Sequence, residues 1–197
     1  MRLLLASRSI PRRRMLEAAG VPFEVVTSDA DEDAEKERLR GAGAEPAALA
    51  EALAQLKAKA VAADRNALVL GCDETLELRA GAGFDKPRSR EEAKSQLQTL
   101  AGTSHKLHSA AVVVEAGASV WRHVESVTLH MRTLSDTFLE SYLDAEHETI
   151  RHGVGGYRIE GLGAQLFDRI EGSHFAILGL PLLPLLAYLR ERGLLAS

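Results

Sequence analysis

The sequence predicts a single α/β domain over residues 1–197, with a mixed sheet pinched into two lobes. Three observations lead to this expectation. Short apolar runs alternate with segments of helical periodicity, which is the pattern of an α/β fold. Residues 106–132 instead suggest two strands joined by a turn, so the sheet is not purely parallel. The chain has 197 residues, which is long enough for one hydrophobic core and short for two.

The first part of the chain is expected to hold two strands and a helix. Residues 3–6 are apolar throughout, which indicates a buried strand. Pro11 suits the first turn of a helix and Gly20 is a typical stop, so we expect a helix between them. Residues 23–27 are expected to form a second strand, and the acidic residues 28–37 a loop or the start of a helix.

The clearest helix is predicted at residues 46–63. Apolar side chains recur there at helical spacing and form one stripe, at Leu49, Leu53, Leu56 and Ala60. The apolar residues 67–71 indicate another buried strand, which delivers Asp73 at its C-terminal end. Ser89, with Glu92 three residues later, forms a capping box that opens a helix to about Leu100.

The next elements are expected to be a hairpin and a helix. Residues 106–115 and 119–132 suggest two strands around a turn at Gly117. Ser135 is placed to cap a helix that extends through Tyr142. This hairpin is the element that makes the predicted sheet mixed.

The C-terminal part is expected to hold a loop, a strand and a helix. Residues 153–163 include five glycines, which indicates a loop with close backbone approaches. The apolar residues 175–178 predict a last strand, and residues 181–192 a closing helix.

Composition excludes several classes of function. The net charge is −4, with a pI near 6.0, so the chain is not a basic coat for nucleic acid. Its single cysteine, Cys72, allows neither an intrachain disulfide framework nor a cysteine-based zinc site. No targeting segment is expected, because the N-terminal apolar run, residues 3–6, is too short for a signal peptide. No membrane-spanning segment is expected either, because prolines interrupt the longest apolar run, residues 175–189. A reducing, cytoplasmic compartment is therefore the default expectation.

An anion site is predicted where the first strand meets the first helix. Ser7, Ser9 and Arg12 combine hydroxyl groups, the free N–H groups of a helix start and a guanidinium group. The alternative interpretation is a helix cap with solvated arginines, and these residues alone leave both open.

Isolated carboxylates and lysines make a second group of candidates. Asp73, after a buried strand, could bind Mg²⁺ or activate water, or could simply serve a turn. Lys57 and Lys86 could neutralise phosphate, although such lysines are more often solvated. Taken together, separate cations and carboxylates favour Mg²⁺-dependent attack on a phosphate chain.

The ordered motifs of the chain resemble those of the Maf-like nucleoside triphosphate pyrophosphatases, and the resemblance covers nearly the whole chain. The family pattern selects Lys57 over Lys59 as its motif lysine. The matching segments are Leu5-Ala6-Ser7-Arg8-Ser9-Ile10-Pro11-Arg12-Arg13, Gly20-Val21-Pro22-Phe23, Asp31-Glu32, Leu53-Ala54-Gln55-Leu56-Lys57-Ala58, Gly71-Cys72-Asp73, Lys86-Pro87, Gly102 to His105, Glu160-Gly161, Ile170-Glu171-Gly172 and Gly179-Leu180-Pro181.

The resemblance implies a Maf/ITPase-like fold, a reaction and a set of roles. A nucleoside triphosphate and water would become the monophosphate and pyrophosphate, in a homodimeric housecleaning enzyme. Asp73 would act as the base, and Glu32 would join it in holding a divalent metal, Mg²⁺ or Mn²⁺. The phosphates would be bound by Ser7, Ser9, Arg12, Lys57 and Lys86. A non-catalytic nucleotide-binding regulator of cell division is the alternative, although a pure binder has no physical need for these carboxylates.

Within the resemblance, the choice of substrate depends on Pro11, Glu74 and Glu160. Many family members have Pro and then Arg after the second serine, where this chain has Ile10 and Pro11. Pyrimidine-preferring members tend to have Thr and Gln where this chain has Glu74 and Glu160. Members of the 7-methyl-GTP type have Gln at the first of these two positions and Glu at the second. The match at Glu160 makes 7-methyl-GTP the leading candidate, with dTTP or UTP as the alternative.

Overall fold

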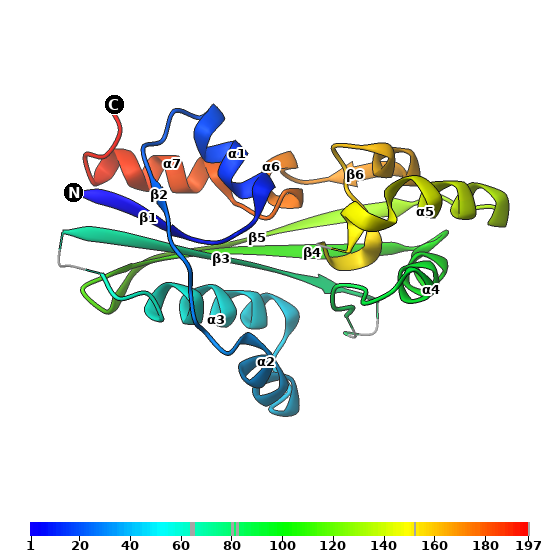
Figure 1. Ribbon diagram of the computed structural model, residues 1–197, viewed down its shortest axis with the longest axis horizontal. Coiled ribbons are helices and arrows are strands. Elements are labelled where there is room, and N and C mark those ends of the chain that lie inside the picture. The colour runs from blue at the N-terminus through cyan, green and yellow to red at the C-terminus, as the bar shows by residue number, and fades with distance from the viewer. Residues whose placement is uncertain (64–65, 80, 82, 152, 197) are drawn as a thin grey trace. The chain divides into compact units, whose positions relative to one another are not determined.

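The strands of the computed structural model, which describes residues 1–63, 66–79, 81, 83–151 and 153–196, form a mixed sheet (Figure 1). They are β1 (Arg2–Ala6), β2 (Glu24–Val25), β3 (Ala67–Glu77), β4 (Ser104–Glu115), β5 (Ala118–Met131) and β6 (Phe167–Glu171). Their order in the sheet is β2-β1-β3-β4-β5-β6. Strand β1 pairs in parallel with β2 and β3, whereas β5 and β6 are antiparallel. The predicted mixed sheet is confirmed.

Helices alternate with these strands along the chain, as the sequence predicted. They are α1 (Ile10–Ala18), α2 (Glu32–Gly41), α3 (Pro46–Lys59), α4 (Arg90–Leu100), α5 (Asp136–Ile150), α6 (His174–Ile177) and α7 (Leu182–Glu191), with 3₁₀ turns η1 (Val154–Gly156) and η2 (Leu162–Leu166). None of the helices within the described ranges is long and apolar enough to cross a membrane.

The chain folds into two compact units. The first unit comprises Met1–Glu74, His108–Glu125 and Ser173–Ser197, and the second comprises Thr75–Leu107 and Ser126–Gly172. Strands β3, β4 and β5 each continue from one unit into the other. The expected α/β class with two lobes is therefore confirmed.

In the first unit, helices cover both faces of β1 and β3. Successive side chains of a strand point to opposite faces, so the fully apolar runs of β1 and β3 fill two separate cores. Figure 1 shows α3 on one face, and α1 and α7 on the other. The α3 core includes Leu4, Val69, Ala50, Ala54 and Ala58, whereas the opposite core includes Leu3, Leu70, Leu16, Leu185 and Leu189.

Helix α3 lies unusually close to β3 because small residues meet there. A Cβ atom placed on Gly71 would lie 2.0 Å from the carbonyl oxygen of Ala54 and 2.9 Å from the backbone nitrogen of Ala58. Only glycine leaves room for this backbone contact. The close approach fixes where the last turn of α3 lies along β3.

In the second unit, α4 and α5 contribute buried side chains to the core. Leu97 and Leu100 of α4 and Leu143 of α5 are fully buried. Aromatic rings extend this core, with Tyr157 packing edge-on against Phe167 at a centroid distance of 4.9 Å. Strand β6 lies at the edge of the sheet beside β5.

Two C-terminal elements correct the sequence prediction. Residues 175–178, predicted as a strand, belong to the short helix α6 and its C-terminal cap. A four-residue apolar run does not distinguish a buried strand from a buried helical turn. Strand β6 was not predicted, because its sequence Phe-Asp-Arg-Ile-Glu is polar and its side chains stay half-buried or exposed.

The N-terminal half differs from the prediction mainly in element length. Strand β3 does not end near Asp73 but continues to Glu77, because Thr75 and Leu76 are buried again in the second unit. The acidic segment after residue 28 forms helix α2, and strand β2 is only two residues long. Helix α3 ends at Lys59, four residues before its predicted end.

Candidate functional site

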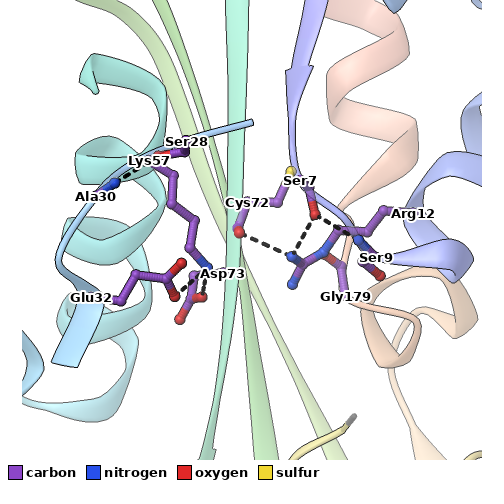
Figure 2. Close-up of polar contacts among 10 residues, drawn as sticks. All are labelled: Ser7, Ser9, Arg12, Ser28, Ala30, Glu32, Lys57, Cys72, Asp73 and Gly179. Atoms are coloured by element: carbon purple, nitrogen blue, oxygen red, sulfur yellow. Dashed lines mark hydrogen bonds and ion pairs between the residues drawn. The ribbon is translucent and has the colours of Figure 1, made fainter. Parts of the chain in front are cut away.

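A lysine ammonium group lies between two carboxylates in the first unit. The Nζ atom of Lys57 donates to Oδ1 of Asp73 at 2.5 Å and lies 2.8 Å from Oε2 of Glu32. Figure 2 shows Lys57 extending from α3 toward both acids. The side chains of Lys57 and Asp73 are 12% and 13% exposed, whereas that of Glu32 is 43% exposed. One edge of this cluster therefore remains open to solvent.

Local structure explains how the three side chains meet. The close packing of α3 on Gly71 places Lys57 beside Asp73, two residues further along β3. The side chain of Asp31 caps α2 by accepting a hydrogen bond from the backbone N–H of Ala34, so Glu32 is the first residue of that helix. Lys59, which helical periodicity alone could not separate from Lys57, is exposed.

Arg12 is buried and ties together three separate chain segments. It is 9% exposed, and its Nε donates to the Gly179 carbonyl at 2.6 Å. Its Nη1 donates to the Cys72 carbonyl at 3.0 Å and to the Ser7 hydroxyl oxygen at 3.3 Å. Figure 2 shows these contacts beside the strand that carries Asp73. The alternative of a solvated Arg12 is therefore excluded.

The start of α1 supplies backbone donors next to this arginine. Ser9 is the N-terminal cap residue, but its side chain makes no capping hydrogen bond to the helix. Its backbone N–H donates instead to the Ser7 hydroxyl oxygen at 3.3 Å. Pro11 lies half-buried in the first turn. A helix start of this kind favours an anion through its exposed N–H groups and dipole.

Glu74 and Cys72 flank Asp73 on β3. The buried Ser109 hydroxyl lies within donating distance of Glu74 Oε1, at 3.1 Å, and of the Ala176 carbonyl, at 2.5 Å. Burial raises the pKa of the Cys72 thiol to about 11, so this side chain packs as a small apolar group. Cys72 is fully buried.

Two predicted site residues, Lys86 and Glu160, belong to the second unit. Lys86 is exposed in the irregular segment between β3 and α4. Glu160 is exposed between η1 and η2, and its neighbour Gly161 packs on the guanidinium group of Arg158. Arg158 in turn forms an ion pair with the buried carboxylate of Glu146 at 3.3 Å.

Comparisons with known proteins identify the family of this chain. A family model described as "Maf-like protein" matches residues 2–192. This chain belongs to the Maf-like family. It is 47% identical to the "Nucleoside triphosphate pyrophosphatase" of Caulobacter vibrioides over 97% of this chain and 96% of the relative. It is also 47% identical to the protein of that name in Paramagnetospirillum magneticum, over 96% and 98%, and to "Nucleoside triphosphate pyrophosphatase 1" of Jannaschia sp., over 99% and 98%.

In this Maf-like chain, the structure brings five of the predicted residues of the first unit into two groups. Glu32, Lys57 and Asp73 form one group, and Ser7 and Arg12 form the other. The reasoning from sequence did not find the carbonyl of Gly179 as a partner of Arg12, or Ser109 beside Glu74. Gly179 did stand in a family motif, but nothing in the sequence indicates a contact across 167 positions.

The donor set of this Maf-like site suits a hard divalent cation. Asp73 and Glu32 already direct carboxylate oxygens at one cation, the Lys57 ammonium. In the part of the chain that the structure describes, no three His, Cys, Asp or Glu side chains gather into a metal cage. Mg²⁺ commonly binds through one or two carboxylates and completes its shell with water and substrate phosphates. Two carboxylates are therefore a sufficient protein contribution.

Proposed function

We propose that this protein hydrolyses a nucleoside triphosphate to the nucleoside monophosphate and pyrophosphate. The observation that carries the proposal is the Lys57 ammonium held between Asp73 and Glu32 beside β3. Phosphoryl transfer needs positioning and charge stabilisation more than covalent chemistry. A base, a cation and a second carboxylate within one cluster provide these. The names of the relatives from Caulobacter vibrioides and Paramagnetospirillum magneticum support the same reaction.

In the proposed reaction, Asp73 accepts a proton from the attacking water. The water oxygen forms a bond to the α-phosphorus, and the bond from that phosphorus to the oxygen bridging to the β-phosphate breaks. The bridging oxygen keeps the electron pair and leaves as part of pyrophosphate. Lys57 orients the Asp73 carboxylate through its 2.5 Å contact with Oδ1. It also places positive charge where charge develops on the phosphates.

Asp73 and Glu32 would hold the divalent metal, Mg²⁺ or Mn²⁺. When bound, such an ion neutralises phosphate charge and lowers the pKa of coordinated water. The remaining proposed phosphate ligands are Ser7, Ser9, Arg12 and Lys86. Arg12 is already fixed by three hydrogen bonds, so it orders the Ser7–Ser9 segment before substrate arrives.

The first test measures the products and the role of Asp73. Phosphorus NMR of the wild-type reaction with Mg²⁺ should show pyrophosphate and a nucleoside monophosphate. Asp73→Asn should lower kcat by about 10²–10⁴-fold, because the side-chain amide still accepts a hydrogen bond from Lys57 but cannot take a proton from water. Asp33→Asn, at an exposed position of α2, is the matched control and should leave kcat unchanged.

Three results would overturn this proposal. Release of orthophosphate and a nucleoside diphosphate would mean that a different bond is cleaved. More than half of wild-type activity in Asp73→Asn would exclude it as the base. Tight nucleotide binding without any product would favour the alternative of a nucleotide-binding regulator.

For the substrate base we propose 7-methyl-GTP. The support is Glu160, a carboxylate at the position where pyrimidine-preferring members tend to carry Gln. An ionised carboxylate accepts two parallel hydrogen bonds, and guanine offers N1–H and N2–H side by side. Uracil and thymine offer one donor between two acceptors, which a carboxylate repels. Glu74 and Pro11, which differ from the 7-methyl-GTP type, belong to the same group of proposed specificity positions.

The specificity test compares kcat/KM for 7-methyl-GTP, UTP and dTTP. We expect wild type to prefer 7-methyl-GTP, and Glu160→Gln to reduce that preference by about tenfold, the cost of an unmatched polar group in a binding site. Glu191→Gln, at the exposed end of α7, should leave the ratios unchanged. A wild-type preference for UTP or dTTP would refute the assignment of the base while leaving the reaction intact.

A homodimer in the cytoplasm completes the proposal. Its support is the resemblance to dimeric family members and the single, buried cysteine. Analytical ultracentrifugation of the full chain should give twice the mass of 21.3 kDa. A monomer at micromolar concentration would contradict it.

A further inference from the structure

The segment that carries Lys86 is held on helix α4 by two side chains. The Nε2 atom of Gln96 donates to the carbonyl oxygen of Asp85, the residue before Lys86, at 3.1 Å. On the other side, the backbone N–H of Arg88 donates to Oε2 of Glu92 at 2.9 Å. Both anchors act on the backbone, and they lie on either side of Lys86 and Pro87.

The two anchors are themselves joined. Gln96 Nε2 also donates to Oε1 of Glu92 at 3.4 Å. The two hydrogens of one amide therefore go to Asp85 and Glu92, and the two oxygens of Glu92 go to Gln96 and Arg88. These bonds close a ring around Lys86 and Pro87. We call Gln96 and Glu92 the α4 clamp.

The burial of Gln96 indicates that the clamp is more than a surface contact. Gln96 is 4% exposed, and its Oε1 has no hydrogen-bond partner among the described residues. Reversing the amide would point Oε1 at two acceptors, so the contacts fix its orientation. A buried amide with an unsatisfied oxygen costs stability, and an apolar residue would suit the interior better. What the amide provides in return is the position of the Asp85 carbonyl.

Further contacts fix the clamp and the segment at both ends. Ser89 caps α4 by accepting from the Glu92 N–H at 3.1 Å, so Glu92 lies in a fixed first turn. At the other end, a Cβ atom on Gly83 would lie 2.1 Å from the Leu76 carbonyl oxygen, so Gly83 lies in close contact with the backbone of β3. Pro87 is buried, whereas the adjacent Lys86 is exposed. The backbone is thus held firmly at an exposed lysine residue.

We infer that Gln96 is a positioning residue that acts, through the α4 clamp, on Lys86. This inference rests on the proposed function, in which Lys86 binds the substrate phosphates. A cation stabilises a transition state best when its position is fixed beforehand, and small displacements are costly. The clamp removes the backbone freedom that a lysine in an irregular segment would otherwise have.

The first experiment asks whether the clamp orders the segment, and it does not depend on catalysis. Gln96→Met keeps the side-chain length and removes both N–H donors. Hydrogen exchange of the peptide that covers residues 84–89 should be faster than in wild type. Gln98→Met, on the exposed face of the same helix, should exchange like wild type. Unchanged protection in Gln96→Met would overturn the inference.

The second experiment is a double-mutant cycle in steady-state turnover. Gln96→Met should lower kcat by about tenfold, and it should have almost no further effect in a Lys86→Ala background, because it acts only through that ammonium. If Gln96→Met lowers kcat by the same factor in the wild-type and Lys86→Ala backgrounds, the inference is overturned while the proposed function stays intact. A Lys86→Ala protein with wild-type turnover would remove Lys86 from the proposed function and overturn the inference as well. Absence of pyrophosphate release in wild type would instead refute the proposed reaction. Hydrogen exchange would still test whether the α4 clamp orders the segment.

A second variant guards against a folding defect in Gln96→Met. Glu92→Ala removes the acceptor of the Arg88 N–H and of one Gln96 N–H near the start of α4, and it leaves the apolar core unchanged. It should show the same dependence of kcat on Lys86, with a melting temperature close to that of wild type. Additive losses in Glu92→Ala and Lys86→Ala would count against the clamp.

Discussion

Two ionisable side chains, Lys57 and His105, show how surroundings decide what a buried group can do. Lys57 is nearly buried, but two carboxylates compensate its charge. His105 is 2% exposed, with its Nε2 atom 2.7 Å from the hydroxyl oxygen of Tyr157. Its Nδ1 has no hydrogen-bond partner in the described part of the chain. Two carboxylates therefore surround the first group, whereas the surroundings of the second favour its neutral form.

His105 should make the stability of the fold depend on pH. Burial, with a smaller contribution from the nearby His130, lowers the pKa of His105 from its ordinary 6.5 to about 4. Between these values the unfolded chain binds the proton more readily than the folded chain. Stability is therefore fully present above pH 6.5 and is lost as the pH falls toward 4. The shift corresponds to about 3 kcal/mol in total.

Urea unfolding at pH 7 and pH 5 checks this prediction. From pH 7 to pH 5, the free energy of unfolding should fall by about 2 kcal/mol more in wild type than in His105→Gln. This variant keeps a hydrogen-bonding group near Tyr157 but does not titrate. His174→Gln, at an exposed histidine, should keep the wild-type pH dependence. If the free energy of unfolding falls equally in His105→Gln and wild type between these pH values, protonation of His105 does not destabilise the fold.

Among the elements, the contact between α3 and β3 links packing to the site. Three small residues, Gly71, Ala54 and Ala58, let the two backbones approach. This contact also determines the position of Lys57, because Lys57 extends from the same turn of α3 toward Asp73. The distance between a helix and a strand therefore sets the distance between a cation and a carboxylate.

Gly71→Ala should damage both stability and turnover. The added methyl group would meet the Ala54 carbonyl oxygen at 2.0 Å, so α3 must move. We expect a loss of about 1–3 kcal/mol in the free energy of unfolding and a lower kcat in the protein that remains folded. Gly41→Ala, in α2 with open space around its Cβ, should change stability by no more than about 0.5–1 kcal/mol. Wild-type turnover in Gly71→Ala would show that the position of α3 does not control the site.

The elements also show what sequence can predict. Helix α4 was predicted correctly because Ser89 and Glu92 mark its start chemically and because its apolar spacing is regular. Helix α6 was predicted as a strand because four apolar residues carry no period. Strand β6 was missed because an edge strand needs no buried face, so its pattern is polar. Prediction therefore succeeded where local residues mark an element and failed where the surroundings of a segment determine its structure.

At the scale of the whole molecule, the same distinction between local signals and long-range contacts applies to the site residues. Ser7, Ser9, Arg12, Lys57 and Asp73 could be selected from their motifs. The partners of Arg12 and Glu74 could not, because Gly179 and Ser109 reach these residues only when distant segments pack together. The α4 clamp was partly visible, since Glu92 belonged to the predicted capping box, but the role of Gln96 depended on its burial.

The two units should unfold as one, because three strands are continuous through both. Strands β3, β4 and β5 are neighbours in the sheet and run from one unit into the other. Unfolding either unit alone would leave strand ends with unpaired backbone groups, which is unfavourable. We therefore expect a single cooperative transition in urea.

Single-tryptophan variants test this prediction in each unit separately. Trp121, the only tryptophan, lies in the first unit, where it stacks on Tyr188 at 5.3 Å. A Trp121→Phe/Phe138→Trp variant moves the probe to α5 in the second unit, where Phe138 is half-buried beside Tyr142. In each protein, the fluorescence transition should coincide with the loss of far-ultraviolet circular dichroism, because both probes report the same event. A fluorescence midpoint in urea that departs from the circular dichroism midpoint in either protein would show that one unit opens before the other. The continuous strands would then not be enough to couple them.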